Sequence, residues 1–474
     1  MKHKKYKSLQ VLHSITDIFR FKRSKKIPLY TPIILIPLLF AFIIFLTVSA
    51  FYVSAKVYSR NQNFYKKYLY LKKLAGNKNI RKFLNIYWET PIDEGMPPHQ
   101  WPKIQQSLSP KSCMACHYDQ YEQWKNSRMS HSMDAGVVAQ LLLKEMTSKH
   151  WKPWVESCLS CHSPIAEYYV KYGKYKGLNN EEKNILKGEP KEQKAMTSAL
   201  NMLKIPIGKG ALSVSCAACH VRYYHRFGPG IKRYIKEGNI AHGGFVPSNA
   251  FNHSYFCIKC HQFGPDQRRL DGKLFENTYN EWKRSIYAKK GISCEVCHNP
   301  QGSMAFKSIY NKNFVLKAVT IRFKIKKINI ISGSVQAILS LKNSGVGHDF
   351  PTYTTPKVIL HIGQENLEKK VFQKTVESYI IGWSVSLNLK KQYFDTRLKP
   401  FQTAKLIYDR PLVKKAKYLK AWVVVEPESH YVRFFKAFLK IKRLPKIIKT
   451  LISEALKQDL DSKYILWKEQ TKLN

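Results

Sequence analysis

The sequence predicts a chain of several domains: an N-terminal membrane-spanning helix, a mainly α-helical and loop domain, and a C-terminal β-sandwich with a terminal helical segment. Three observations predict this order. Residues 27–55 carry no charge, all ten cysteines lie between Cys113 and Cys297, and apolar residues alternate with polar ones beyond Pro300.

The uncharged run 27–55 is long enough to cross a bilayer as a helix. The basic segment before it, residues 1–26, holds nine lysines and arginines against one acidic residue, Asp17. The positive-inside rule places such an end in the cytoplasm. We therefore expect a single-pass anchor in the cytoplasmic (inner) membrane, with the bulk of the chain facing the periplasm. The alternative is a cleaved signal peptide, because small residues precede Phe51 and Lys56.

Residues 56–110 read as a helical stalk that ends at the proline-rich stretch PIDEGMPPHQWP, a linker or turn signal. The cysteine-containing domain then follows over residues 111–305.

Every cysteine of the chain belongs to a Cys-x-x-Cys-His string. The five strings are Cys113/Cys116/His117, Cys158/Cys161/His162, Cys216/Cys219/His220, Cys257/Cys260/His261 and Cys294/Cys297/His298. Five copies that use up the whole cysteine complement are not a product of composition, so the strings carry chemistry.

Three other chemistries fit this spacing less well. A zinc site takes four ligands, usually from two cysteine pairs or from one pair and distant histidines. A thioredoxin-like site needs one pair beside a strand and a helix, and disulfides would leave the histidines unexplained. The remaining interpretation is c-type haem attachment, in which both thiols bind the haem and the adjacent histidine binds its iron. The motifs thus predict five covalently bound haem c groups with five proximal histidines.

The segment 306–430 has the two-residue period of strands, at 319–325, 335–341 and 358–362, with further strands in TAKLIYD and KAWVVVEP. This pattern predicts the β-sandwich. Residues 431–474 read as basic helices broken near Pro445. We expect them to pack against the haem domain, with binding to a membrane surface as the alternative.

The charge of the chain is strongly positive, with 80 Lys and Arg against 32 Asp and Glu, a net charge of +48. Such a field attracts nucleic acid, anionic lipid, an acidic redox partner or a small anion. Export and haem argue against nucleic acid. The abundance of lysine throughout the chain also allows a purely compositional origin.

Several blocks resemble periplasmic multihaem cytochromes related to the tetrahaem cytochrome of ammonia oxidisers. These blocks are CMACHYDQYEQWKNS, CLSCHSPIAE, CAACHVR followed by RFGP, FCIKCHQF, ENTYNEWKRSIYAKKGISCEVCHNP and GVGHDFPT. The resemblance spans about residues 97–430. It implies electron transfer through stacked haems, most often with histidine on both faces of the iron.

The resemblance also indicates distal iron ligands. His242 in AHGGF and His348 in GVGHDFPT stand where such ligands are expected. His225 is a further candidate, for a neighbouring haem rather than the one held by His220, because the tether to His220 is short.

Two departures from the family pattern bear on the ligands. The pattern Trp-x-x-Ser-x-His ends here in Met129, with His131 two residues on, so Met129 or His131 is the candidate, or that iron face is open. The second copy continues to Tyr287, and Tyr353 stands where glycine is expected after FPT. A methionine ligand would raise the haem potential.

Two functions follow. In the first, every iron has six ligands, and the chain passes electrons from a quinol-linked complex or periplasmic cytochrome to an acceptor. In the alternative, one open haem reduces or oxidises a small nitrogen or sulfur compound. A scaffold or adhesion role has the β-sandwich in its favour and the five haem motifs against it. The sequence favours electron transfer over catalysis.

Overall fold

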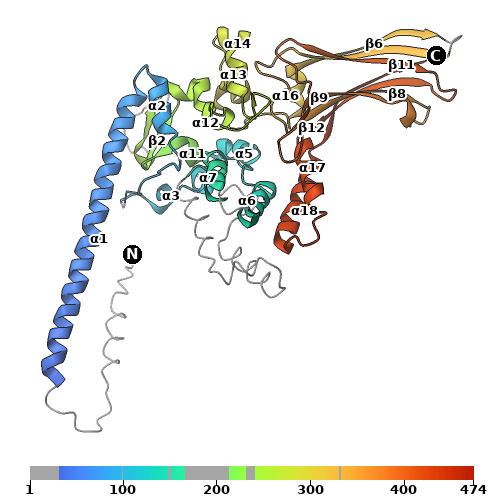
Figure 1. Ribbon diagram of the computed structural model, residues 1–474. Helices are drawn as coiled ribbons and strands as arrows, with labels where there is room; N and C mark the ends of the chain where they lie inside the picture. Colours follow the sequence, from blue (N-terminus) through green and yellow to red (C-terminus); the bar gives the residue numbers. More distant parts are fainter. Residues whose placement is uncertain are drawn as a thin grey trace, which may run out of the picture. The chain divides into compact units, whose positions relative to one another are not determined.

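The computed structural model describes residues 31–98, 100–147, 151–165, 213–230, 241–329 and 333–473 (Figure 1). The chain divides into two compact units, residues 1–63 and residues 64–474. The predicted basic segment 1–26 and the first residues of the uncharged run lie outside the described residues.

Helix α1 (Thr31–Ala75) contains most of the uncharged run. It continues without a break into a lysine-rich stretch that begins at Lys56, so the uncharged residues form only one part of a longer helix. Within the described part of the chain, no helix combines the length and the apolar character needed to cross a membrane. The predicted transmembrane helix, and with it the single-pass location in the inner membrane, is therefore wrong.

The second unit begins with the end of α1, where Leu71 and Leu74 pack against α2. The helices of its first part are α2 (Ile80–Tyr87), α3 (Lys103–Gln106), α4 (Pro110–Met114), α5 (Tyr118–Lys125), α6 (Ala135–Thr147), α7 (Trp151–His162), α11 (Cys216–His220), α12 (Ile258–His261), α13 (Thr278–Lys283), α14 (Ile286–Lys289), α15 (Cys294–His298) and α16 (Lys312–Ala318). Short 3-10 turns lie among them: η4 (Ala241–Gly243), η5 (Asn249–Asn252), η6 (Ser254–Cys257) and η7 (Pro300–Gly302).

Short strands connect some of these helices. They are β1 (Val221–Arg222), β2 (His225–Gly228) and β3 (Phe245–Pro247), which form one small sheet, and the hairpin β4 (Arg269–Leu270) and β5 (Lys273–Leu274). Most of this region is therefore short helix and loop, as the sequence predicts.

The C-terminal part forms two antiparallel sheets (Figure 1). One has the order β11-β7-β6 and the other β10-β9-β8-β12-β13. The strands are β6 (Val319–Asn329), β7 (Ser334–Asn343), β8 (Lys357–Glu365), β9 (Glu377–Val385), β10 (Gln392–Asp395), β11 (Thr403–Pro411), β12 (Tyr418–Glu426) and β13 (Tyr464–Lys472), with the 3-10 turn η8 (Gln373–Thr375) between β8 and β9.

The sandwich core comes from the alternation seen in the sequence. Leu339 of β7, Leu360 of β8 and Val423 of β12 are fully buried in one apolar cluster. The predicted strands over 319–325, 335–341 and 358–362 and those in TAKLIYD and KAWVVVEP are confirmed.

The terminal segment differs in part from the prediction. Helices α17 (Ser429–Phe438) and α18 (Lys446–Asp461) form on either side of Pro445, but residues 464–472 form strand β13 instead of a helix. The reason is tertiary: β13 pairs antiparallel with β12, and Leu466 enters the sandwich core. Ile448 and Ile452 of α18 pack against Leu141 of α6, which confirms packing against the cysteine-containing domain.

Candidate haem-binding site

Each cysteine motif lies at a short helical turn. Helices α7, α11, α12 and α15 end on the histidine of their motif. In a helix, residues i, i+3 and i+4 lie on the same face. The two thiols and the imidazole of such a motif therefore project to one side, as one covalently held planar ligand requires.

The first motif departs from this arrangement at its second thiol, Cys116. Helix α4 ends at Met114, so Cys116 and His117 lie in the turn that follows, although the His117 N–H still donates to the Cys113 carbonyl at 2.9 Å. The side chain of Cys116 is exposed, whereas that of Cys113 is half-buried in contact with Cys216.

Cys297, the second thiol of the fifth motif, is exposed as well, and the remaining eight cysteines are half-buried. The predicted attachment residues Cys116 and Cys297 are therefore not enclosed by the chain as their partners Cys113 and Cys294 are. The difference follows from contacts between motifs: Cys113 contacts Cys216 and Cys294 contacts Cys257, and these contacts cover the first thiol of each motif. Attachment of haem through Cys116 and Cys297, as through the other eight cysteines, stays a prediction.

Hydrogen bonds at Nδ1 fix the orientation of most motif histidines. Carbonyl oxygens accept from His162 (Ser132 O, 2.6 Å), His220 (Phe227 O, 2.8 Å) and His298 (Lys307 O, 2.7 Å). A carbonyl can only accept, so Nδ1 carries the proton and the lone pair of Nε2 stays free. This is the usual arrangement of a metal-bound imidazole.

Burial keeps several of these histidines neutral. It lowers the pKa of His261 to about 4 and also lowers the pKa of His220 and His298. Iron binds the neutral imidazole, so burial favours the ligating form.

Cysteines of different motifs contact one another. The side chain of Cys113 contacts Cys216, and Cys257 contacts Cys294. The second and fourth motifs are also in contact. The Cys161 thiol lies 3.6 Å from the carbonyl oxygen of Lys259, and the Cys260 thiol lies 4.0 Å from the carbonyl oxygen of Cys161.

These contacts link the five motifs into one connected set. Motif one adjoins motif three, and motif four adjoins motifs two and five. Electrostatic interactions between Cys219 and both Cys257 and Cys260 join motifs three and four. Motif four is thus the branch point of the set.

His348 faces the histidine of the fifth motif. The ring centroids of His298 and His348 are 6.3 Å apart and their planes differ by 17°. Two metal–imidazole bonds of about 2 Å each, with half a ring on either side, span roughly this distance. His348 Nδ1 donates to the carbonyl of Asp349 at 2.9 Å, so its Nε2 is also free. Burial lowers the pKa of His348 to about 4. The pair fits the two faces of one iron.

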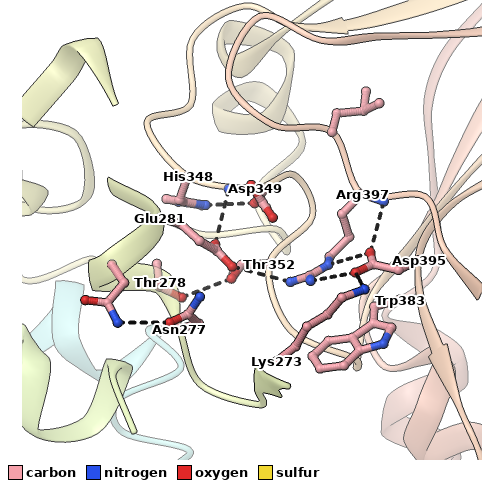
Figure 2. Close-up of polar contacts among 12 residues, drawn as sticks. Lys273, Asn277, Thr278, Glu281, His348, Asp349, Thr352, Trp383, Asp395 and Arg397 are labelled. Atoms are coloured by element: carbon pink, nitrogen blue, oxygen red, sulfur yellow. Dashed lines mark hydrogen bonds and ion pairs between the residues drawn. The ribbon is translucent and has the colours of Figure 1, made fainter. Parts of the chain in front are cut away.

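A line of polar contacts holds the His348 loop (Figure 2). The Asp349 N–H donates to Glu281 of α13 at 3.2 Å, and Arg397 lies 3.4 Å from the other oxygen of Glu281. Arg397 donates twice to Asp395, each at 2.9 Å, and Lys273 donates to Asp395 at 2.8 Å. The β-sandwich is thereby joined to the loop that carries His348.

Gly347 lets this loop approach α13 and α14 closely. A Cβ on Gly347 would lie 3.2 Å from the Trp282 ring and 3.3 Å from Tyr287. The absence of a side chain at Gly347 therefore allows the loop to lie close to Trp282 and Tyr287.

His242 lies near His117 of the first motif, close enough for the two imidazoles to affect each other electrostatically. Its backbone is left-handed, with φ 47° and ψ 30°, and its N–H donates to Gln105 Oε1 at 2.7 Å. Its Nδ1 bonds the Gly244 carbonyl at 3.1 Å, which leaves Nε2 free. A histidine held in this uncommon conformation fits a ligand position.

His131 shows the same hydrogen bond, from Nδ1 to the Ser127 carbonyl at 2.8 Å. The adjacent Ser132 donates to the His162 carbonyl at 2.8 Å, which places His131 beside the second motif. The backbone carbonyl of Met129 accepts from Ser132 at 2.9 Å, and its side chain is half-buried. Of the two candidates, His131 has the orientation of a ligand.

His225 has a different environment. Its ring stacks on Tyr68 with centroids 3.4 Å apart and planes within 10°. Burial, with Arg226 and Lys72 nearby, lowers its pKa to about 4. This packing accounts for the position of His225 without a haem. His361 bonds Ser378 and stacks on Trp422 of the sheet, a structural role.

The two copies of the Trp-x-x-Ser pattern have the same local structure. Trp124 Nε1 donates to the Val214 carbonyl and Trp282 Nε1 to the Ile292 carbonyl, each at 2.9 Å. In both copies the serine hydroxyl donates to the tryptophan carbonyl at 2.7 Å. Val214 and Ile292 each precede the first cysteine of a motif by two residues. The tryptophan of each copy therefore anchors the entry to a motif, the third and the fifth.

The alternatives to haem find no support among the described residues. No group of three or more His, Cys, Asp and Glu there is arranged to hold a metal by itself, and the cysteines are free. Paired thiols at one helical turn, an adjacent imidazole with a free Nε2 and an opposing histidine fit haem c.

Some residues of the site cannot be predicted from the sequence. Glu281 and Arg397 act through contacts between distant segments and carry no local signal. Tyr353, whose hydroxyl is 2.6 Å from His261 Nδ1, does carry one, because it replaces an expected glycine.

A match to a family model agrees with this chemistry. Residues 112–189 match the family model described as cytochrome c554 and c-prime. No curated protein matches the chain. A penta-heme cytochrome c552 from Thermochromatium tepidum is 15% identical, with a TM-score of 0.49, over 78% of this chain and 99% of that one. The putative ApaA protein from Bordetella pertussis is 12% identical, with a TM-score of 0.13, over 23% of this chain and 74% of that one. The family match and the motifs together support a c-type cytochrome with several haems.

Proposed function

We propose that the chain is an electron-transfer protein that carries five covalently bound haem c groups, each iron having two side-chain ligands. When bound, each haem exchanges one electron between ferric and ferrous iron. The observation that carries the proposal is the proximity of the motifs: the first contacts the third, the fourth contacts the second and the fifth, and Cys219 of the third interacts electrostatically with Cys257 and Cys260 of the fourth. Groups held by touching motifs are close enough for electrons to pass between them.

The side chains of the site supply positions and orientations. The cysteines fix the groups, the proximal histidines are oriented through Nδ1, and His348, His242 and His131 offer a free Nε2. The excess of positive charge favours an acidic redox partner. We propose a quinol-linked complex or another cytochrome as that partner.

The first test is composition and spin state. Intact mass of the mature protein should show five haems, and electron paramagnetic resonance of the oxidised protein should show low-spin ferric signals only. A stoichiometric high-spin haem that binds nitrite or cyanide would instead support an oxidoreductase of small nitrogen or sulfur compounds.

The second test is a pair of variants. His348→Ala should produce a new high-spin signal from one haem, because it removes the imidazole opposite His298. His361→Ala is the matched control, since His361 bonds Ser378 on the sheet. An unchanged spectrum in His348→Ala would refute the assignment of His348.

A further inference from the structure

Tyr353 has a backbone conformation that is unfavourable for a tyrosine. Its φ is +67°, in the left-handed region where a Cβ crowds the backbone. Non-glycine residues held in this region often serve a function that the surrounding structure enforces. Tyr353 also stands where the resembling family has glycine, so we asked what its side chain does.

The Tyr353 hydroxyl contacts a histidine of the haem motifs. It lies 2.6 Å from Nδ1 of His261, the histidine of the fourth motif. The side chains of Glu276 and Thr278 are close enough to the phenol to affect it electrostatically. The Thr278 hydroxyl is 2.9 Å from that of Thr352, which precedes Tyr353. The phenol is thus buried beside the fourth motif, with its hydroxyl at His261.

Chemistry fixes the direction of these hydrogen bonds. If Nε2 of His261 binds iron, Nδ1 carries the proton and donates it to the phenol oxygen. The phenol oxygen is then the acceptor at His261. His162, His220 and His298 donate instead to backbone carbonyls. His261 therefore differs from these three in its acceptor.

We propose that Tyr353 is a positioning residue that orients His261, makes it a stronger donor to iron, and so sets the midpoint potential of the haem at the fourth motif separately from the others. A hydrogen bond accepted from Nδ1–H raises the basicity of a ligating histidine and stabilises the oxidised iron. The proposal rests on the proposed function, since it needs a haem at Cys257 and Cys260.

The place of the fourth motif gives this effect a consequence. That motif adjoins the second, third and fifth motifs. A potential set at this branch point biases which neighbour holds the electron. A side chain acting on His261 alone therefore acts on the whole set of motifs.

The test is a redox titration of the full haem-loaded protein, followed by absorbance and by electron paramagnetic resonance. Tyr353→Phe keeps the ring and removes the hydroxyl. We expect one haem to shift to a higher potential, with a change in one low-spin signal, while the other potentials stay in place. Tyr353→Gly relieves the backbone and also lacks the hydroxyl, so it should give the same shift.

Tyr87→Phe is the matched control. Tyr87 is buried and its hydroxyl donates to the carbonyl of Cys219 at 2.8 Å, so the variant loses a hydroxyl beside a motif but none at a histidine nitrogen. Unchanged potentials in both Tyr353 variants, or the same shift in Tyr87→Phe, would overturn the inference. Fewer than five haems in the unmutated protein would instead overturn the proposed function, so the two failures are distinguishable.

Discussion

Replacing Arg397 with methionine should destabilise the protein strongly, because the guanidinium neutralises two carboxylates in a nearly closed environment. The Arg397 side chain is 7% exposed, and those of Glu281 and Asp395 are 4% and 13% exposed. Methionine fills a similar volume but leaves both carboxylates without this cation (Figure 2).

The size of the effect follows from the pKa of Asp395. Burial alone would raise this pKa, but hydrogen bonds from Arg397 and Lys273 outweigh burial and lower it from 3.8 to about 2. At about 1.4 kcal/mol per pKa unit, that shift is worth roughly 2 kcal/mol at neutral pH. Glu281 loses its cation as well. We expect a total loss of about 3 kcal/mol, the low end of the range for a broken buried ion pair, because Asp395 keeps Lys273.

Urea unfolding at pH 7, followed by far-ultraviolet circular dichroism, measures this loss. The matched control is Lys273→Met: Lys273 binds the same Asp395 but its side chain is 41% exposed, so its removal should cost about 1 kcal/mol or less. Burial raises the pKa of Glu281 to about 7, so the loss in Arg397→Met should be larger at pH 8 than at pH 6. Equal losses in the two variants would refute the reasoning.

Three other predictions concern separate parts of the molecule. Burial raises the pKa of Glu428 to about 8 and that of Asp459 to about 7. At these two carboxyls the folded state binds more protons than the unfolded state, so ionising them as pH rises destabilises the fold. Between about pH 7 and pH 8, above the usual pKa of histidine, the urea midpoint should therefore fall less steeply in Glu428→Gln than in the unmutated protein. Leu339→Ala, at a fully buried core position, should cost about 2–5 kcal/mol in urea unfolding. Gly347→Val should push the His348 loop from the two aromatic rings beside it and give a high-spin signal, which a spectrum identical to that of the unmutated protein would contradict.

The sequence identifies the elements whose signal is local. The Cys-x-x-Cys-His strings predict their own helical turns, because three ligands at i, i+3 and i+4 share one helix face. The exposure of Cys116 is not local in this sense, since it depends on which thiol of the motif meets a neighbouring motif. Two-residue alternation predicts β7, whose buried positions are the apolar ones.

Elements that depend on distant partners are not predictable in this way. Strand β13 exists because β12 offers a free edge, and its sequence alone reads as part of a helix. The prediction of a membrane anchor was wrong for a related reason. It considered the uncharged run alone, whereas most of that run belongs to a helix that continues to Ala75. Likewise, His348 faces His298 only because the chain folds back on itself across the 50 positions that separate them.

The two Trp-x-x-Ser copies share one local structure although the residues that follow them differ. In each copy the tryptophan indole and the serine hydroxyl make the same hydrogen bonds, so the pattern fixes the backbone that enters a motif. The residue two positions after the serine takes no part in those bonds, and it differs between the two copies: Met129 in the first and Tyr287 in the second. In the second copy it is Tyr287, which packs on Gly347, and the imidazole opposite the motif comes from His348 of the β-domain loop. The Trp-x-x-Ser pattern therefore fixes the backbone that enters a Cys-x-x-Cys-His motif, whereas the histidine that faces the motif is found only from the fold.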